Sequence, residues 1–141
     1  MTQRAFALHP RDPATVIHGA GDDYRYLATG EQTGGSYFAL EATVPPGAGP
    51  PPHVQTREEE GFYVIEGTVT FWPDGEEIVA GPGTFLHVPR GVVHHFRNDG
   101  DVSARMLIWF APAGIEAMFS AMAADPERYL EIGAEYGVSF L

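Results

Sequence analysis

Short stretches in which hydrophobic and polar residues alternate dominate the chain from residue 24 to residue 111. Such alternation places every second side chain on the same face of a β-strand. Many short strands at close spacing, with few helices between them, indicate an antiparallel all-β sandwich or barrel. The pattern predicts strands over 24–28, 35–44, 61–72 (broken at Gly67), 78–83, 84–89, 92–98 and 103–111, with a hairpin turn at Asp74-Gly75.

Two segments depart from this alternation. The proline-rich stretch 45–52 cannot pair as a central strand, because proline has no N–H, and is expected to be a loop at the rim of the barrel. Over 114–124 the hydrophobic residues recur at helical spacing, which predicts a helix packed on the barrel. Asp125-Pro126 is expected to supply an N-cap and first-turn proline for a second helix, which ends at Gly137.

The length and composition agree with one domain. The 141 residues are 44% hydrophobic, and 17 glycines and 12 prolines suit a fold with many turns. We expect a single domain over 1–141, with a barrel core at about 36–112 and a helical segment at about 114–137.

Charge and cysteine content exclude several classes of protein. The net charge of −11 and the eight scattered basic residues argue against a nucleic-acid partner. The absence of cysteine excludes disulfides and thiolate metal ligands. No apolar run suits a signal peptide or a membrane span, so a cytoplasmic protein without a membrane partner is expected.

Histidines, glutamates and glycines occur at fixed spacings in two short motifs. The first runs Gly47-x5-His53-x-Gln55-x4-Glu60-x6-Gly67, and the second runs Gly83-x5-Pro89-x-Gly91-x2-His94-x3-Asn98. The two motifs resemble the signatures of the cupin superfamily, and the first departs from its signature only at Gln55, where a second histidine is usual. The fifteen residues between the motifs, and the flanking strands and helices, resemble those of small single-domain bacterial quercetinase-like cupins.

The resemblance implies a double-stranded β-helix, or jelly-roll barrel, that is usually a homodimer. It also implies one divalent metal ion inside the barrel, held by His53, Glu60 and His94, with Gln55 at the place of the missing histidine. This set of ligands tolerates Fe, Mn, Ni, Co or Zn.

Gln55 leaves three arrangements open. Its amide oxygen could be a weak fourth ligand to the metal. It could instead stand back and hydrogen-bond a water or the substrate, leaving the facial triad of two histidines and a carboxylate. The glutamine at residue 55, in place of a histidine, could also have abolished metal binding.

Strand alternation also predicts which other side chains face the site. His53 and Gln55 point together, as do His94 and Phe96, while His95 should point away. Glu60 is expected to face inward, whereas Glu58 and Glu59 are expected at the rim. The candidate for a general base is either Glu59 or a Glu60 that does not bind the metal. Trp72 and Trp109 are interpreted as core or interface residues. The expected substrate-binding wall contains Phe62, Val64, His87, Phe96, Met106 and Ile108.

Three functions fit these residues. The favoured hypothesis is a metal-dependent dioxygenase, resembling quercetinase, that acts on a small aromatic or enolic molecule. The second is a non-redox isomerase or cyclase, such as a polyketide cyclase, in which the metal polarises a carbonyl. The third is a cupin that binds a small molecule without catalysis.

Overall fold

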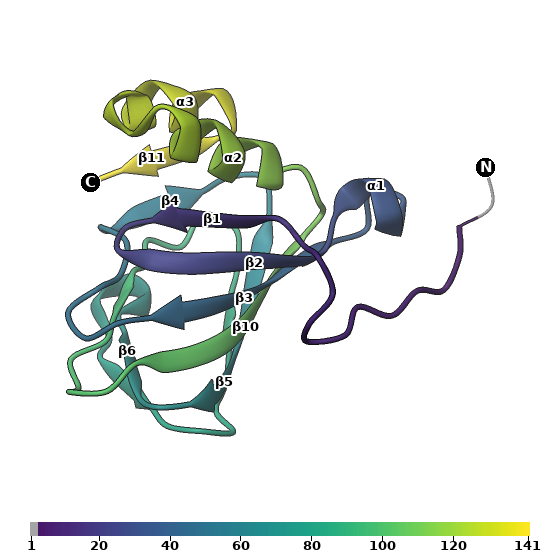
Figure 1. Ribbon diagram of the computed structural model, residues 1–141. Coiled ribbons are helices and arrows are strands. Elements are labelled where there is room, and N and C mark those ends of the chain that lie inside the picture. Colours follow the sequence, from purple (N-terminus) through teal and green to yellow (C-terminus); the bar gives the residue numbers. More distant parts are fainter. Residues whose placement is uncertain (1–2) are drawn as a thin grey trace.

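Antiparallel strands form most of the regular secondary structure in this computed structural model, which describes residues 3–141. The expected all-β fold is therefore confirmed. The largest sheet has six strands, and Figure 1 shows most of them side by side. In spatial order they are β1 (Val16–Gly19), β2 (Asp22–Ala28), β3 (Phe38–Val44), β10 (Ala104–Ala111), β5 (Glu59–Glu66) and β8 (Phe85–Val88).

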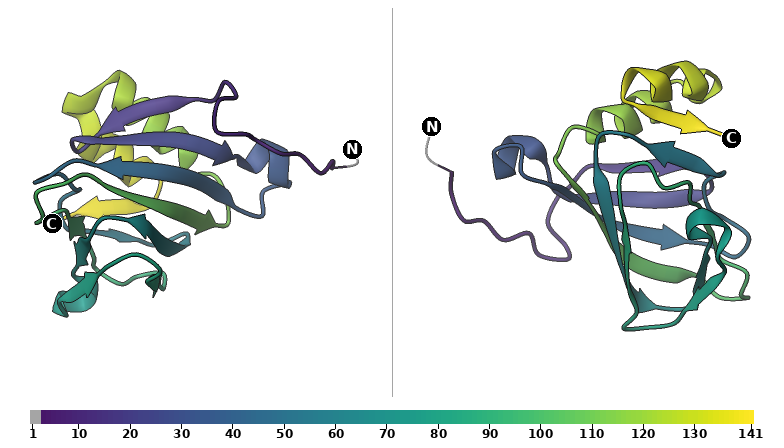
Figure 2. Two further views of the ribbon diagram at one scale, coloured as in Figure 1. Left: turned by 60° about the horizontal axis from the view of Figure 1, so that its bottom comes forward. Right: turned by 180° about the vertical axis from the view of Figure 1, so that it is seen from behind.

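Two smaller sheets face the large one and complete the barrel (Figure 2). One has three strands in the order β7 (Ile78–Ala80), β6 (Val69–Phe71) and β9 (Phe96–Arg97). The other pairs β4 (His53–Gln55) with β11 (Val138–Phe140). The core lies between these sheets and contains the inward side chains of each strand.

Alternation along β3 and β10 shows how the barrel excludes water from its interior. Every second residue of each strand is buried, and the two strands are in register over their whole length. Phe38 and Phe110 are directly opposite one another, with their rings stacked 5.7 Å apart. Complete burial of such large rings contributes roughly 2–3 kcal/mol each to folding, so this pair helps to fix the wall on which the site is built.

Short helices cover one end of the barrel. Figure 1 shows α2 (Glu116–Ala124) and α3 (Tyr129–Glu135) above the strands, beside β11. The Tyr26 hydroxyl ties α2 to β2 by donating to the Glu116 carbonyl at 3.1 Å. A further short helix, α1 (Gly30–Thr33), joins β2 to β3.

Most of the expected elements are present, with some changes at their ends. The predicted strand 61–72 is two strands, β5 and β6, which are separated at Gly67, where φ is +76°. Asp74 and Gly75 form a tight 3-10 turn, as expected of a turn, and both have positive φ. Of the predicted strand 92–98, only residues 96–97 form a regular strand. His94 instead makes an isolated β-bridge to His53.

The C-terminal predictions hold in outline. A short 3-10 turn over Pro126–Arg128 precedes α3, and Asp125 makes no side-chain capping hydrogen bond there. Gly137 has φ of +74° just after α3, which suits the expected end of that helix. The short strands β1 and β11 were not predicted. Among the residues that the structure describes, no helix is both long and apolar enough to cross a membrane.

Candidate metal centre

Two strands and one bridge position bring the motif residues together. β4 begins immediately after the proline-rich loop and has His53 and Gln55 on its buried face. The backbones of His53 and His94 exchange two hydrogen bonds, of 3.0 and 2.9 Å. Glu60 lies on β5, and its side chain is buried in the same interior.

His53, Glu60 and His94 form a compact cluster of possible ligands. One nitrogen from each imidazole and one oxygen of the carboxylate all lie within 4.8 Å of one another. The His94 Nε2 atom is 2.9 Å from the Glu60 Oε1 atom. The three residues that the two sequence motifs identified as ligands therefore lie together in the structure.

Backbone carbonyls orient both imidazoles. His53 Nδ1 donates to the Pro51 carbonyl at 2.9 Å, and His94 Nδ1 donates to the Val92 carbonyl at 2.9 Å. With Nδ1 committed to a backbone acceptor, Nε2 of each ring is the atom left for a ligand. Two imidazole nitrogens and a carboxylate oxygen, turned inward in this way, fit a divalent first-row transition metal.

The protonation of the cluster follows from its burial. Burial, aided by the nearby His94, lowers the pKa of His53 to about 4, so this ring is in the neutral form that can bind a metal. Burial also raises the pKa of Glu60, although its hydrogen bond with His94 opposes the shift. For His94, burial lowers the pKa, but the hydrogen bond and charge of Glu60 outweigh it and the net shift is upward.

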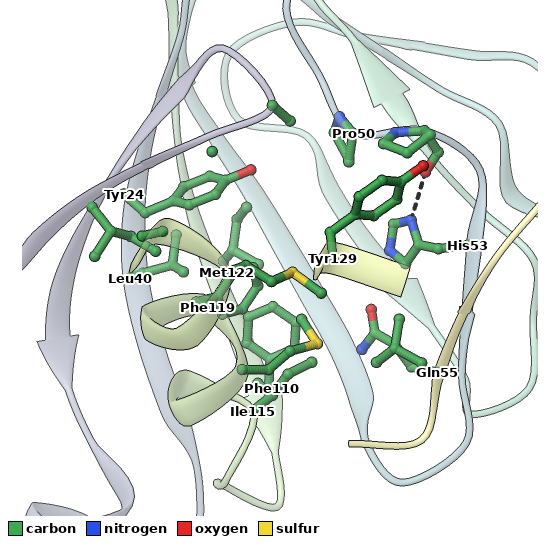
Figure 3. A pocket seen from close by; sticks show the side chains of 18 of the residues that line it. Tyr24, Leu40, Pro50, His53, Gln55, Phe110, Ile115, Phe119, Met122 and Tyr129 are labelled. Carbon is green, nitrogen blue, oxygen red and sulfur yellow. Dashed lines mark hydrogen bonds between the residues drawn. The ribbon is translucent and has the colours of Figure 1, made fainter. Parts of the chain in front are cut away.

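Gln55 lies directly beside this cluster. Figure 3 shows its amide oxygen on the side of His53, and the Gln55 side chain raises the pKa of His53, as an acceptor oxygen beside the imidazole would. Its amide nitrogen is buried and has no hydrogen-bond partner of normal geometry in the described part of the chain. The side chain therefore presents its oxygen toward the possible ligands.

Glu58 corrects one expectation. It was expected at the rim, but its side chain is only 4% exposed. Burial and the nearby Glu60 raise its pKa, whereas the adjacent Gln55 amide lowers it. The reason is strand alternation, because Glu58 and Glu60 are two residues apart and both turn inward, while Glu59 remains half-exposed near Arg90. The same alternation in the sequence could have identified Glu58.

A cavity of about 330 Å³ adjoins the cluster, and Figure 3 shows His53 and Gln55 on one side of it. This volume is sufficient for a small organic molecule. Three of the six expected wall residues, Phe62, Phe96 and Ile108, line the cavity.

The other three expected wall residues do not line the cavity. Val64 and Met106 are opposite one another on β5 and β10, and both are buried in the core. His87 is exposed on the outer face of β8, so its expected inward orientation is wrong. Its neighbour Val88 faces inward instead, because adjacent residues of a strand point to opposite faces.

The C-terminal segment supplies much of the wall that sequence reasoning missed. The helical repeat over 114–124 was interpreted only as packing on the barrel. Several of its residues also line the cavity, as do residues of β2, β11 and α3. These contributors are Tyr24, Ile115, Met118, Phe119, Met122, Tyr129, Val138 and Phe140.

The outward orientation predicted for His95 is confirmed, whereas Trp72 and Trp109 are only partly buried and are not core residues. His95 points away from the cavity, and its ring stacks on Trp72 with the centroids 4.6 Å apart. Trp109 lies on the outer face of β10, against Phe85. Neither tryptophan lines the cavity.

Comparisons with known proteins agree with this geometry. Residues 40–110 match the model of the cupin domain family. Quercetin 2,3-dioxygenase of Bacillus subtilis is 34% identical over 125 residues, which cover 84% of this chain but only 37% of that protein. The polyketide synthase protein CurC of Streptomyces cyaneus is 36% identical over 125 residues, which cover 83% of this chain and 81% of that protein.

Solved structures show the same fold. An RmlC-like cupin from Shewanella frigidimarina superposes with a TM-score of 0.69 at 21% identity, over 83% of this chain and 99% of that one. The motifs, the barrel and these matches together establish that the chain belongs to the cupin superfamily.

Proposed function

We propose that this cupin is a metal-dependent dioxygenase that acts on a small aromatic or enolic molecule, as quercetinases do. The observation that carries the proposal is the buried cluster of His53, Glu60 and His94 at the wall of a largely apolar cavity. The similarity to quercetin 2,3-dioxygenase supports it, although the chain spans only 37% of that protein's length.

In this proposal, His53 Nε2, His94 Nε2 and a Glu60 oxygen hold one divalent ion of Fe, Mn, Ni, Co or Zn. The Gln55 amide oxygen is a weaker fourth ligand, because it is already turned toward His53. A redox-active ion of this kind would supply the binding and activation of O2, and any of these ions would act as a Lewis acid.

The protein's own side chains have three tasks. One Glu60 oxygen would hold the ion, and its second carboxylate oxygen is available to accept the proton of a substrate hydroxyl. Phe62, Phe96 and Ile108 hold an aromatic ring beside that carboxylate. The helix α2 excludes water from the cavity, which strengthens every electrostatic interaction inside it.

A second candidate is a non-redox cyclase or isomerase that acts on a polyketide. It is favoured by the match to the polyketide synthase protein CurC, of which the chain covers 81%. The same carboxylate would then move a proton on a substrate whose carbonyl is polarised. A cupin that only binds its ligand is the remaining alternative.

The first experiment is metal analysis of the purified protein by mass spectrometry, beside Glu60→Ala and Gln55→Ala. We expect close to one equivalent of a single metal, which Glu60→Ala loses and Gln55→Ala weakens. A wild-type protein that neither contains a metal nor takes up Fe(II), Ni(II) or Zn(II) would overturn both enzyme proposals and favour the binding alternative.

Oxygen dependence separates the two enzymes. A flavonol and a polyketide substrate are each supplied to the metal-loaded protein in air and under argon. Turnover of the flavonol only in air supports the dioxygenase. Turnover of the polyketide that persists under argon supports the cyclase instead.

We also propose that the protein is a homodimer. The outer face of the large sheet carries Tyr63, Phe85, Leu107 and Trp109 as neighbours, and Tyr63 and Phe85 are 42% and 58% exposed. A contiguous apolar face of this kind is typical of a protein interface.

A further inference from the structure

Polar atoms are few in the cavity and occur in separate places. His53, Gln55 and Glu60 lie on one side, and Figure 3 shows Tyr24 across the cavity from His53 and Gln55. The other polar side chains of the lining, His18 and Tyr129, are exposed. Tyr24 is therefore the buried polar group of the far wall.

Tyr24 is joined to a buried carboxylate. Asp22 and Tyr24 are two residues apart on β2 and both face the interior. The Tyr24 hydroxyl donates to the Asp22 Oδ2 atom at 2.8 Å. Asp22 is fully buried, and its Oδ1 atom has no hydrogen-bond donor among residues 3–141.

The Tyr24 hydroxyl has an unused acceptor on the cavity wall. The hydroxyl proton of Tyr24 is committed to Asp22, so the Tyr24 oxygen can only accept a further hydrogen bond. Asp22 does not line the cavity, so its part is to orient the Tyr24 hydroxyl. A buried acceptor that faces a cavity without a donor is costly, which favours a donor from a bound molecule.

We infer that the Tyr24 hydroxyl, held in place by Asp22, forms a second polar subsite of the cavity, which accepts a hydrogen bond from a hydroxyl group of the substrate. This inference rests on the proposed function and adds to it a hydroxyl remote from the metal centre. A carboxylate or phosphate would not suit the subsite, because the Tyr24 hydroxyl proton is committed to Asp22 and the Tyr24 oxygen offers an anion no donor.

The position of the subsite constrains the length of the substrate. Tyr24 is on β2 and Glu60 is on β5, and β3 and β10 lie between them in the sheet. Three strand spacings separate the two residues along the curved wall, but their side chains are nearer across the interior, where, in addition to burial, the charge of Glu60 still raises the pKa of Tyr24. The aromatic side chains of Phe62, Phe110 and Phe119 line the space between. A planar molecule of two or three rings, with a hydroxyl at the far end, fits this arrangement.

The test compares the binding of matched ligands. Isothermal titration of the Zn(II)-loaded protein is carried out with 3-hydroxyflavone and with derivatives that carry one added hydroxyl on a remote ring position. We expect at least one derivative to bind about tenfold more tightly than 3-hydroxyflavone, which is the effect of one well-placed hydrogen bond to a buried acceptor.

Two variants locate the effect. Tyr24→Phe should bind the derivative and 3-hydroxyflavone within about twofold of one another, because the acceptor is gone. Tyr63→Phe is the matched control, since Tyr63 lies on the outer face of β5, is 42% exposed and does not line the cavity. It should keep the tenfold preference.

The outcomes separate this inference from the proposed function. Equal binding of all ligands by the wild type, or a preference that survives Tyr24→Phe, overturns the subsite and leaves the aromatic substrate in place. If no flavone binds at all, the proposed substrate class fails and the subsite fails with it.

Discussion

Gln55 and Glu58 show how single residues tune the candidate metal centre. The Gln55 amide nitrogen is a donor and the Glu58 Oε1 atom is an acceptor, and both are buried without a hydrogen-bond partner in the described chain. Against the effect of burial, the Gln55 side chain lowers the pKa of Glu58, which indicates that the two groups are close enough to pair. Such a pair would hold the amide with its oxygen toward the metal ligands, in the way that outer residues orient ligands in metal sites.

The Glu58 carboxylate is therefore expected to affect metal binding. Glu58→Ala should weaken the affinity for Zn(II) by roughly tenfold, because Gln55 loses the group that orients it. The affinity is measured by competition with a chelator. Glu59→Ala is the matched control, since Glu59 is the adjacent, half-exposed carboxylate, and should bind Zn(II) as the wild type does. Equal losses in the two variants would contradict the role of Glu58.

Asp22 should make stability depend on pH. Burial raises the pKa of Asp22 to about 7 from an ordinary value of 3.8. Between these values the folded protein keeps a proton that the unfolded chain has released, so the free energy of unfolding falls as the pH rises through this range. Asn at this position cannot release a proton, yet it still offers an oxygen to Tyr24.

The expected result is a difference that grows with pH. Asp22→Asn should have a higher Tm than the wild type at about pH 8, and the gap should narrow toward about pH 5. Thermal melts across this range, recorded for both proteins without added metal, measure the gap. A gap that is constant with pH would show that Asp22 ionises in the folded protein as it does in the unfolded chain.

Strand pairing adds constraints that one strand does not reveal. Gly61 on β5 lies opposite Trp109 on β10. A Cβ atom built at Gly61 would lie 2.2 Å from the indole ring of Trp109. The glycine therefore gives the tryptophan room to lie flat across the outer face of the sheet.

This close approach predicts a cost for any side chain at residue 61. Gly61→Ala should reduce the free energy of unfolding by about 1–3 kcal/mol, because the indole must move. Urea denaturation measures this change. Gly81→Ala serves as the control, because its Cβ atom would meet no atom within 4 Å, and should unfold close to the wild-type midpoint. A Gly61→Ala protein as stable as the wild type would show that Trp109 moves without cost.

The exposed apolar residues on the outer face of the large sheet are the proposed contact surface of the dimer. Phe85→Glu should dissociate the proposed dimer, because it places a charge in the centre of an apolar contact. Sedimentation velocity measures the mass of the species. Val79→Glu provides the comparison, since Val79 is 66% exposed on the three-stranded sheet and should leave the dimer intact. A monomeric wild type would contradict the dimer directly.

The strands and the shared faces of the motif residues could be predicted from the amino-acid sequence, because both depend on local periodicity. Residues two apart on a strand share a face, which predicted the inward His53 and Gln55 and the outward His95. The two motifs likewise identified Glu60 and His94 before any contact was known, and the structure brings them within hydrogen-bonding distance.

The surroundings of these residues could not be predicted from the sequence. They consist of contacts between elements that are far apart in the chain, and these contacts form only when the protein folds. The return of β11 to β4 and the docking of α2 on Tyr26 carry the C-terminal segment over the cavity. Curvature of the sheet leaves Val64 and Met106 in the core while the equally apolar Phe62 and Ile108 line the cavity. Alternation fixes the face on which a side chain lies, but the packing of distant elements decides whether that face meets solvent, core or cavity.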